Sequence, residues 1–323
     1  MKYFFILFLI NYAFLFSNSF NQKVSYKIDA ELIPETRILK VKSLMSYQNN
    51  SPDELGEIYV HIYWNLYSAK SYARKLARTQ KDYYSQITKD VEIKKVLLLQ
   101  NGEERLNDYE LDNTVMRIPL IKPLKPGDSL NLEIELEEEV PPEGLRMGYY
   151  KRNFSIAHWF PSVCVYDKFG WHKDQYLGTG EFYEEISDFE VNITLPKTYL
   201  IFSTGVVQNQ NEVYTEEILD RLEEAKKSNQ PVRIYTPPDR IEINDKEVQT
   251  WKIKAPNVRT FAFAAFEDYL WDAASTGNVL VHTIYPKSLE NFYKEEGMKA
   301  ALHAIKFYSE KIIWAGPGKD VIT

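Results

Sequence analysis

Apolar and polar residues alternate at a period of two through long stretches of this chain, and this constrains the fold more than any other feature. In Val24–Leu32 every second residue is apolar, and the residues between them are Ser, Lys, Asp and Glu. Leu130–Glu137 repeats the pattern, with leucine and isoleucine on one side and asparagine and glutamate on the other. Such a strand has one face in a core and one in water, which is typical of antiparallel sheets. We therefore expect a mainly β protein.

Other segments with strand or helix patterns fill most of the chain. Leu39–Met45 follows the first run after a turn-like Pro34–Arg37 stretch, so the two runs predict a β-hairpin. Further strands are expected at 58–64, 93–99, 114–120, 188–195, 199–204, 247–254, 258–266 and 279–284. Helical spacing appears at 68–83, 215–227 and 288–313. The apolar stripe of the last helix is predicted to consist of Leu289, Tyr293, Ala301, Ile305, Tyr308 and Ile312.

The order of these elements divides the chain into regions. Strands dominate from residue 20 to about 275, whereas a strand and a long helix occupy 276–323. Such a change is typical of a domain boundary. We predict a β domain at 20–275 and the beginning of a second, incomplete domain at 276–323. On this division the β domain folds without the tail, so a chain ending near Gly277 is expected to be more soluble than the full 323-residue chain and no less thermally stable.

The first 19 residues have the pattern of an export signal. Lys2 precedes an apolar run from Tyr3 to Phe16, which is long enough for a signal core and too short to span a bilayer. Ser17 and Ser19 are small residues at a cleavage-like spacing, so the mature chain is expected to begin near Phe20. An uncleaved anchor is the alternative. We predict an exported protein, periplasmic or extracellular, with no stable membrane span after cleavage.

The charge of the chain argues against nucleic acid as a partner. The formal net charge is −7, and removal of residues 1–19, which hold one lysine and no acid, makes it −7 − 1 = −8. A negative protein lacks the basic surface that phosphate backbones require. The lone Cys164 cannot form an internal disulfide, so stability must come from the core. The oligomeric state is not determined by the sequence.

Groups that could bind a metal or perform catalysis are few. The five histidines form no His-Glu-x-x-His motif, and one cysteine cannot make a paired-cysteine zinc site. The densest polar and aromatic stretch is 157–183. One interpretation of it is a metal site drawn from His158, Cys164, Asp167, His172 and Asp174. The alternative is a loop whose aromatic rings pack on a sheet while its polar side chains satisfy the backbone.

Three further features have a structural and a functional interpretation. Glu181, Glu184 and Glu185 could supply a carboxylate pair for glycoside hydrolysis, although acids close in sequence are expected by chance in so acidic a chain. His61 alternates with tyrosines on a strand, and we expect a half-exposed structural histidine. His303 lies beside the apolar stripe of the last helix, where we expect packing and no chemistry.

Four segments, taken in order, resemble one protein family. They are YKIDAELIPETRILKVKSLMSYQNNSPDELGEIYVHIYWN at 26–65, HWFPSVCVYDKFGWHKDQYLGTGEFYEEISDFEVNITLP at 158–196, NVRTFAFAAFEDYLWDAAS at 257–275 and VLVHTIYPKSLENFYKEEGMKAALHAIKFYSEKI at 279–312. They resemble the N-terminal part of aminopeptidase N-like zinc metallopeptidases, the gluzincins, and in particular bacterial secreted members. The resemblance covers nearly the whole mature chain.

The resemblance implies a fold and a function. It implies an antiparallel, saddle-shaped β-sandwich domain followed by the first strand and helix of an incomplete α/β, thermolysin-like catalytic domain. In the family the long helix leads through an aromatic, proline-rich segment into a strand, a substrate strand and the zinc helix. Here the chain reads IIWAGPGKDVIT and stops at Thr323, so the zinc ligands and the catalytic glutamate have no counterpart.

We therefore expect the non-catalytic N-terminal portion of a secreted zinc metallopeptidase, which supports and covers a peptide-binding pocket. Zinc would belong to the full-length enzyme, with none expected in this chain, and the chain alone should be inactive. In members of the family, a segment of the β domain lines the pocket for the substrate's amino terminus. The matching segment here is Lys151–Ser155, and Asn153 is the candidate substrate-binding residue in it. The alternative is a stand-alone secreted β-sandwich module that binds carbohydrate or peptide through the aromatic segment 159–183.

Overall fold

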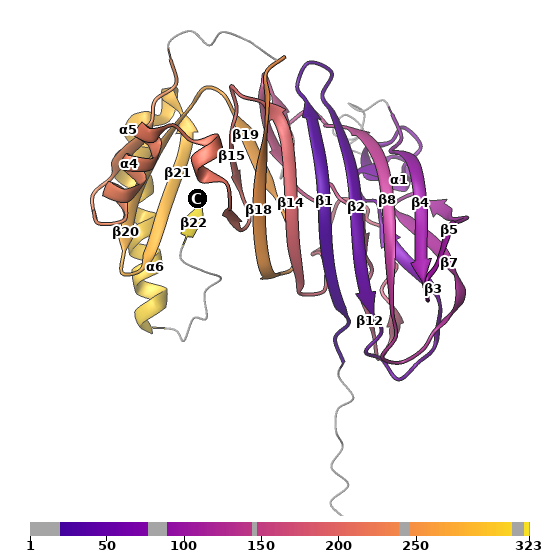
Figure 1. The fold of residues 1–323 in the computed structure, drawn as a ribbon. Coiled ribbons are helices and arrows are strands. Elements are labelled where there is room, and N and C mark those ends of the chain that lie inside the picture. Colours follow the sequence, from indigo (N-terminus) through magenta and orange to yellow (C-terminus); the bar gives the residue numbers. More distant parts are fainter. Residues whose placement is uncertain (1–19, 77–88, 144–146, 239–245, 312–319, 323) are drawn as a thin grey trace, which may run out of the picture.

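The computed structural model describes residues 20–76, 89–143, 147–238, 246–311 and 320–322. Strands make up about half of the described residues and helices much less (Figure 1). The prediction of a mainly β protein with antiparallel sheets is confirmed. Among the helices in these ranges, none is long and apolar enough to cross a bilayer.

An eight-stranded sheet forms the largest layer (Figure 1). From edge to edge its strands are β16 (Val206–Val207), β18 (Val248–Val258), β14 (Ser187–Pro196), β1 (Lys23–Ile33), β2 (Ile38–Gln48), β8 (Ser129–Glu139), β4 (Glu92–Gln100) and β5 (Glu103–Leu106). Neighbours are antiparallel except β1 and β14, which run parallel. Parallel neighbours require a long connection, and much of the remaining β structure lies in that connection.

Alternating residues decide which face of this sheet is buried. In β1, Tyr26 and Ile28 are buried while Lys27 and Asp29 are exposed. The predicted hairpin is confirmed, because β1 and β2 pair antiparallel along their whole length. The turn between them places Arg37 in the left-handed backbone region, at a φ of 60°.

Smaller sheets pack on the apolar face of the large one. Their orders are β15 (Leu200–Ser203), β19 (Phe263–Phe266), β10 (Asn153–Ile156), β9 (Gly148–Tyr150); then β11 (Ser162–Val163), β3 (Leu55–His61), β7 (Val115–Leu124), β6 (Glu110–Asp112); and the hairpin β12 (Tyr166–Asp167) with β13 (Gly170–Trp171). One core cluster unites these layers, with Ile28 of β1, Ile58 of β3 and Phe154 of β10 all buried in it. Full burial of each such side chain contributes roughly 1.5–3 kcal/mol.

A second, separate sheet lies beside one edge of the large one (Figure 1). Its strands, in order, are β17 (Val232–Tyr235), β20 (Tyr269–Thr276), β21 (Val279–Pro286) and β22 (Asp320–Ile322). β20 is antiparallel to both of its neighbours, β17 and β21, whereas β22 runs parallel to β21.

Two helices cover opposite faces of this second sheet. Helix α4 (Glu216–Ala225), preceded by the short α3 (Gln210–Val213), packs Leu222 near Trp271 and Leu280. Helix α6 (Met298–Lys311) packs Met298 on alternate residues of the same strands. The expected helix at 215–227 is confirmed, and Thr215 caps it by accepting a hydrogen bond from the Ile218 backbone.

Two other predicted elements are shorter than expected. The helix expected at 68–83 is described only as α1 (Tyr72–Leu76), after a 3-10 turn, η1 (Tyr63–Tyr67), and its remaining residues lie outside the described ranges. The strand expected at 258–266 is β19 alone, and the residues before it have no strand structure apart from the end of β18.

The apolar stripe predicted for the last helix is confirmed in part, because Ala301 and Ile305 pack on the second sheet whereas Leu289 and Tyr308 do not. That segment begins with η2 (Lys287–Leu289), α5 (Glu290–Phe292) and a π-helical turn, η3 (Tyr293–Gly297), before α6. A π turn holds extra backbone, so it rotates everything after it relative to a regular helix. Leu289, which precedes the π turn, and Tyr308, which follows the last contact with the sheet at Ile305, are each about half exposed. Ile312 lies outside the described residues, and the contacts are made by Met298, Ala301, Leu302 and Ile305.

The predicted domain boundary at 275/276 falls at a turn between paired strands. Thr276 of β20 is the register partner of Val279 of β21. The second sheet therefore contains residues from both sides of that boundary, and β17 adds a strand from before residue 240.

Candidate functional site

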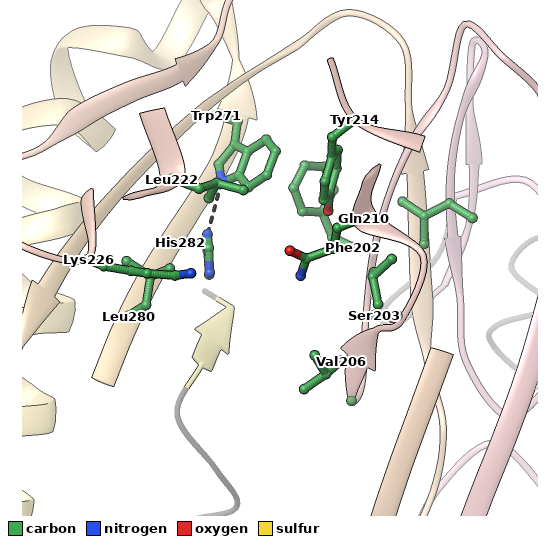
Figure 2. A pocket seen from close by; sticks show the side chains of 13 residues that line it. Phe202, Ser203, Val206, Gln210, Tyr214, Leu222, Lys226, Trp271, Leu280 and His282 are labelled. Carbon is green, nitrogen blue, oxygen red and sulfur yellow. Dashed lines mark hydrogen bonds between the residues drawn. The ribbon is translucent and has the colours of Figure 1, made fainter. Parts of the chain in front are cut away.

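A small pocket lies between the second sheet and the edge of the β layers (Figure 2). Its volume is about 90 Å³, which holds a few waters or one side chain. Strands β15, β16, β20 and β21 and helices α3 and α4 contribute its walls. The side chains drawn there include Phe202, Gln210, Tyr214, Trp271 and His282. A concave, aromatic-walled site with a few polar groups is typical of a binding pocket.

A buried hydrogen bond fixes one wall of this pocket. The Trp271 indole Nε1–H donates to Nδ1 of His282 at 3.0 Å (Figure 2). Because Nδ1 accepts, neutral His282 carries its proton on Nε2. Burial lowers the pKa of His282 to about 4, so the ring is neutral at physiological pH. The wall is therefore rigid and uncharged.

The rim supplies one charged group. Lys226 lines the pocket, and its ammonium is 2.6 Å from the Glu223 carboxylate one turn earlier in α4. Both side chains are well exposed, so this pair contributes little to stability. The combination of aromatic walls and a paired cation suits the capture of an apolar or aromatic side chain better than it suits acid–base chemistry.

Sequence reasoning missed Trp271 and His282. They lie on facing strands of a hairpin, where Ala273 is the register partner of His282 and Trp271 is its diagonal neighbour. The sequence signal was the turn-like Thr276-Gly277 between two alternating runs, which sets this register once the hairpin is assumed.

Asn153 lies away from the pocket, in a cluster of polar contacts that joins β10 to the turn before β20. We call this cluster, which includes Asn153, Glu267 and Asp268, the polar knot. The side-chain Nδ2 of Asn153 donates to Asp268 at 2.8 Å, and its Oδ1 accepts from the backbone of Glu267 at 3.3 Å. Arg152 and Thr198 also bond to Glu267. Both ends of the Asn153 amide are thus engaged, and the residue is almost fully buried. A substrate contact at Asn153 would have to use the second Nδ2 hydrogen or the second lone pair of Oδ1, on a side chain with little exposed surface.

The aromatic segment 157–183 contributes mainly to the core. Trp159 and Phe160 are fully buried, and Trp159 donates its indole hydrogen to the Phe261 carbonyl at 3.0 Å. His158, at a positive φ of 53°, stacks on Phe182. Exposed rings of the segment include Phe169 at its hairpin tip and Tyr183. Packing on the sheet is therefore the interpretation that the structure favours for most of these rings.

The candidate metal ligands of this segment lie apart. Cys164 is fully buried beside Tyr59 and Val115, while Asp167 and His172 pair with each other at 2.9 Å between Oδ2 and Nε2. His158 faces Glu184 instead, at 3.9 Å between Nδ1 and Oε1. In the described ranges no three His, Cys, Asp or Glu side chains are grouped so that they could hold a metal.

The three glutamates differ in environment. Glu181 is exposed, whereas Glu184 and Glu185 are buried. Burial raises the pKa of Glu184 to about 7 and also raises that of Glu185. Glu185 accepts a hydrogen bond from the Gln22 backbone at 3.2 Å, which gives it a structural role.

Two expectations about histidines are wrong. His61 is buried, because β3 lies inside its small sheet and the His61 ring stacks on Tyr63 at 4.7 Å between centroids. Burial lowers the pKa of His61 to about 4. His303 is exposed on α6 and lies 6.4 Å from the Phe307 ring, since the rotated helix turns other residues to the sheet.

Comparison with known protein families finds no family that matches this chain, and comparison with curated proteins finds no match.

Proposed function

We propose that this chain is the N-terminal, non-catalytic part of a secreted, aminopeptidase N-like zinc peptidase. In this proposal the layered β region is the saddle-shaped β-sandwich domain of that family, and the second sheet opens its thermolysin-like domain. The role of the chain is to support and cover a pocket for peptide substrate. Zinc would be held by residues that follow it in the full-length enzyme.

The strand–helix–strand unit at the end of the described chain carries this proposal. β21 leads into α6, and β22 then returns parallel to β21. Such a crossover is the building unit of α/β domains, and it differs in kind from the antiparallel hairpins before it. It also matches the order of the family, in which the long helix leads through an aromatic, proline-rich segment into a strand.

The second sheet changes where the proposed catalytic domain begins. Because β20 and β21 pair over eight residues, we place the junction before Tyr269, not at residue 276. The polar knot around Asn153 and Glu267 then lies at this junction. In the proposal, the pocket for the peptide substrate lies at this junction and is a different pocket from that of Figure 2. Asn153 is then close to the substrate, because its hydrogen bonds join the two parts at the same place.

The test is hydrolysis and zinc content of the 323-residue chain. We expect no cleavage of aminoacyl reporters and no stoichiometric zinc after dialysis, because the family's ligand helix is not in the sequence. Near-equimolar zinc together with activity that disappears when His158 or His172 is replaced by Ala would contradict the proposal.

The pocket of Figure 2 favours a second candidate, a module that binds peptide or carbohydrate. Its aromatic walls could receive one side chain of a peptide or the face of a sugar ring. Titration of tryptophan fluorescence with peptides and oligosaccharides tests this candidate. Binding that is lost in Phe202→Ala and kept in Phe307→Ala, an exposed ring on α6, would support it.

A further inference from the structure

A patch of exposed apolar side chains lies at the end of the molecule where the chain enters β1. The Phe20 ring stacks on Tyr166 of the β12–β13 hairpin, with 6.2 Å between centroids. Phe169, at the tip of that hairpin, is 79% exposed, and Tyr183 and Ile186 are each half exposed. Figure 1 shows β12 beside the point where the chain leaves the lower end of β1. We call the exposed Phe169, Tyr183 and Ile186, together with the partly buried Phe20, the N-terminal patch.

We propose that the N-terminal patch rests on the surface of a lipid bilayer while the apolar run Tyr3–Phe16 is held in that membrane. Only Ser17, Asn18 and Ser19 separate this run from Phe20. Four residue steps span at most about 14 Å, even when fully extended. Any membrane that holds the run therefore lies within reach of the patch. This inference does not depend on the peptidase proposal, and it concerns the chain that keeps residues 1–19, the uncleaved anchor of the two alternatives given by the sequence.

The residue types of the patch suit a membrane surface. The Lys168 ammonium lies 4.9 Å from the centre of the Phe169 ring, so the hairpin tip presents an apolar ring beside a cation. Aromatic rings prefer the headgroup region, and basic side chains are attracted to anionic lipids. Tyr183 has an apolar body and a polar tip, which is the character of interfacial residues.

Nearby acidic groups are engaged within the protein. Asp167 accepts hydrogen bonds from the Phe169 backbone at 2.8 Å and from Tyr183 at 3.3 Å, and it also contacts His172. Asp53 accepts from the Tyr166 hydroxyl, at 2.8 Å. These contacts draw the carboxylates toward the protein, which reduces their repulsion of anionic lipid.

The experiment measures how close the hairpin comes to lipid. The full chain is made by cell-free synthesis with vesicles of phosphatidylethanolamine and phosphatidylglycerol, and it carries an environment-sensitive dye at Lys168→Cys. The native Cys164 is fully buried, so it does not compete for the dye. A dye at Phe307→Cys on α6 is the matched control. We expect a blue shift and quenching by brominated acyl chains at position 168 and neither at position 307.

A second variant measures the contribution of the ring. Phe169→Ser is expected to raise the lipid concentration for half-maximal binding about tenfold, which corresponds to about 1.4 kcal/mol. Phe307→Ser should leave that concentration unchanged. Equal dye responses at both positions, or vesicle binding that Phe169→Ser does not weaken, would overturn the proposal. Concentration-dependent dimers that Phe169→Ser abolishes would instead assign the patch to a second copy of the chain.

Discussion

Glu138 provides the sharpest test of the packing described above. It follows Leu136 on the apolar face of β8 and is opposite Leu39 of β2, with only 4% of its surface exposed. Its Oε1 has no hydrogen-bond partner among the described residues. Burial alone raises the pKa of this carboxyl well above its usual range. Glu138 therefore destabilises the fold, and Glu138→Leu should stabilise it.

The magnitude follows from the unsatisfied group. A buried polar atom without a partner costs about 1–3 kcal/mol, so we expect Glu138→Leu to raise the free energy of unfolding by about that amount near pH 7. The size of this gain depends on pH. Below about pH 4 the carboxyl is protonated in both states, and the difference should shrink. As pH rises, the unfolded state gains by ionising while the folded state keeps its proton, so the penalty of wild-type Glu138 grows until the folded pKa is passed.

The assay is urea unfolding, followed by circular dichroism at pH 4 and pH 7 for wild type and two variants. The control is Glu137→Leu, because Glu137 lies on the opposite face of β8, where it pairs with the partly exposed Lys94. We expect that control to change stability by less than about 1 kcal/mol. A destabilised Glu138→Leu, or a gain that is the same at both pH values, would refute the account of this core.

Two other predictions concern the backbone and the tail. A chain ending at Gly277 should aggregate or melt at a lower temperature than the full chain, because it loses β21 and exposes the buried Trp271. Size-exclusion profiles and melting curves measure this difference. A short chain that is monomeric and equally stable would contradict the prediction. Gly205→Ala should cost clearly more stability than Gly102→Ala: both glycines have positive φ, but a Cβ at 205 would lie 2.4 Å from the Lys254 carbonyl oxygen and one at 102 would meet no atom within 4 Å. Equal thermal shifts for the two glycine variants would count against the packing of β16 on β18.

Alternation of residue types made the hairpin of β1 and β2, strand β8 and helix α4 predictable. Period two or period 3.6 identifies the face that a segment buries. It does not identify which strand lies next to that segment. The parallel pairing of β1 with β14, whose paired residues are 163 positions apart in the sequence, therefore could not be predicted.

The same limit explains where expectation and structure differ at the end of the chain. The strand at 279–284 was expected to begin a separate domain, yet its partner β20 comes from the preceding region. The π turn at Tyr293–Gly297 shifts the helical phase between Leu289 and α6, so the predicted stripe matches the packed residues in part, at Ala301 and Ile305. At the site, the pairing of Trp271 with His282 depends on strand register, which residue type alone does not reveal.

The coding sequence downstream of the codon for Thr323 tests the central proposal most directly. If the chain is the N-terminal part of an aminopeptidase N-like enzyme, the reading frame continues and encodes a substrate strand, a His-Glu-x-x-His helix and a third, more distant glutamate. A stop codon directly after Thr323, with the same chain recovered intact from the exported fraction by mass spectrometry, would contradict the proposal and favour the stand-alone binding module.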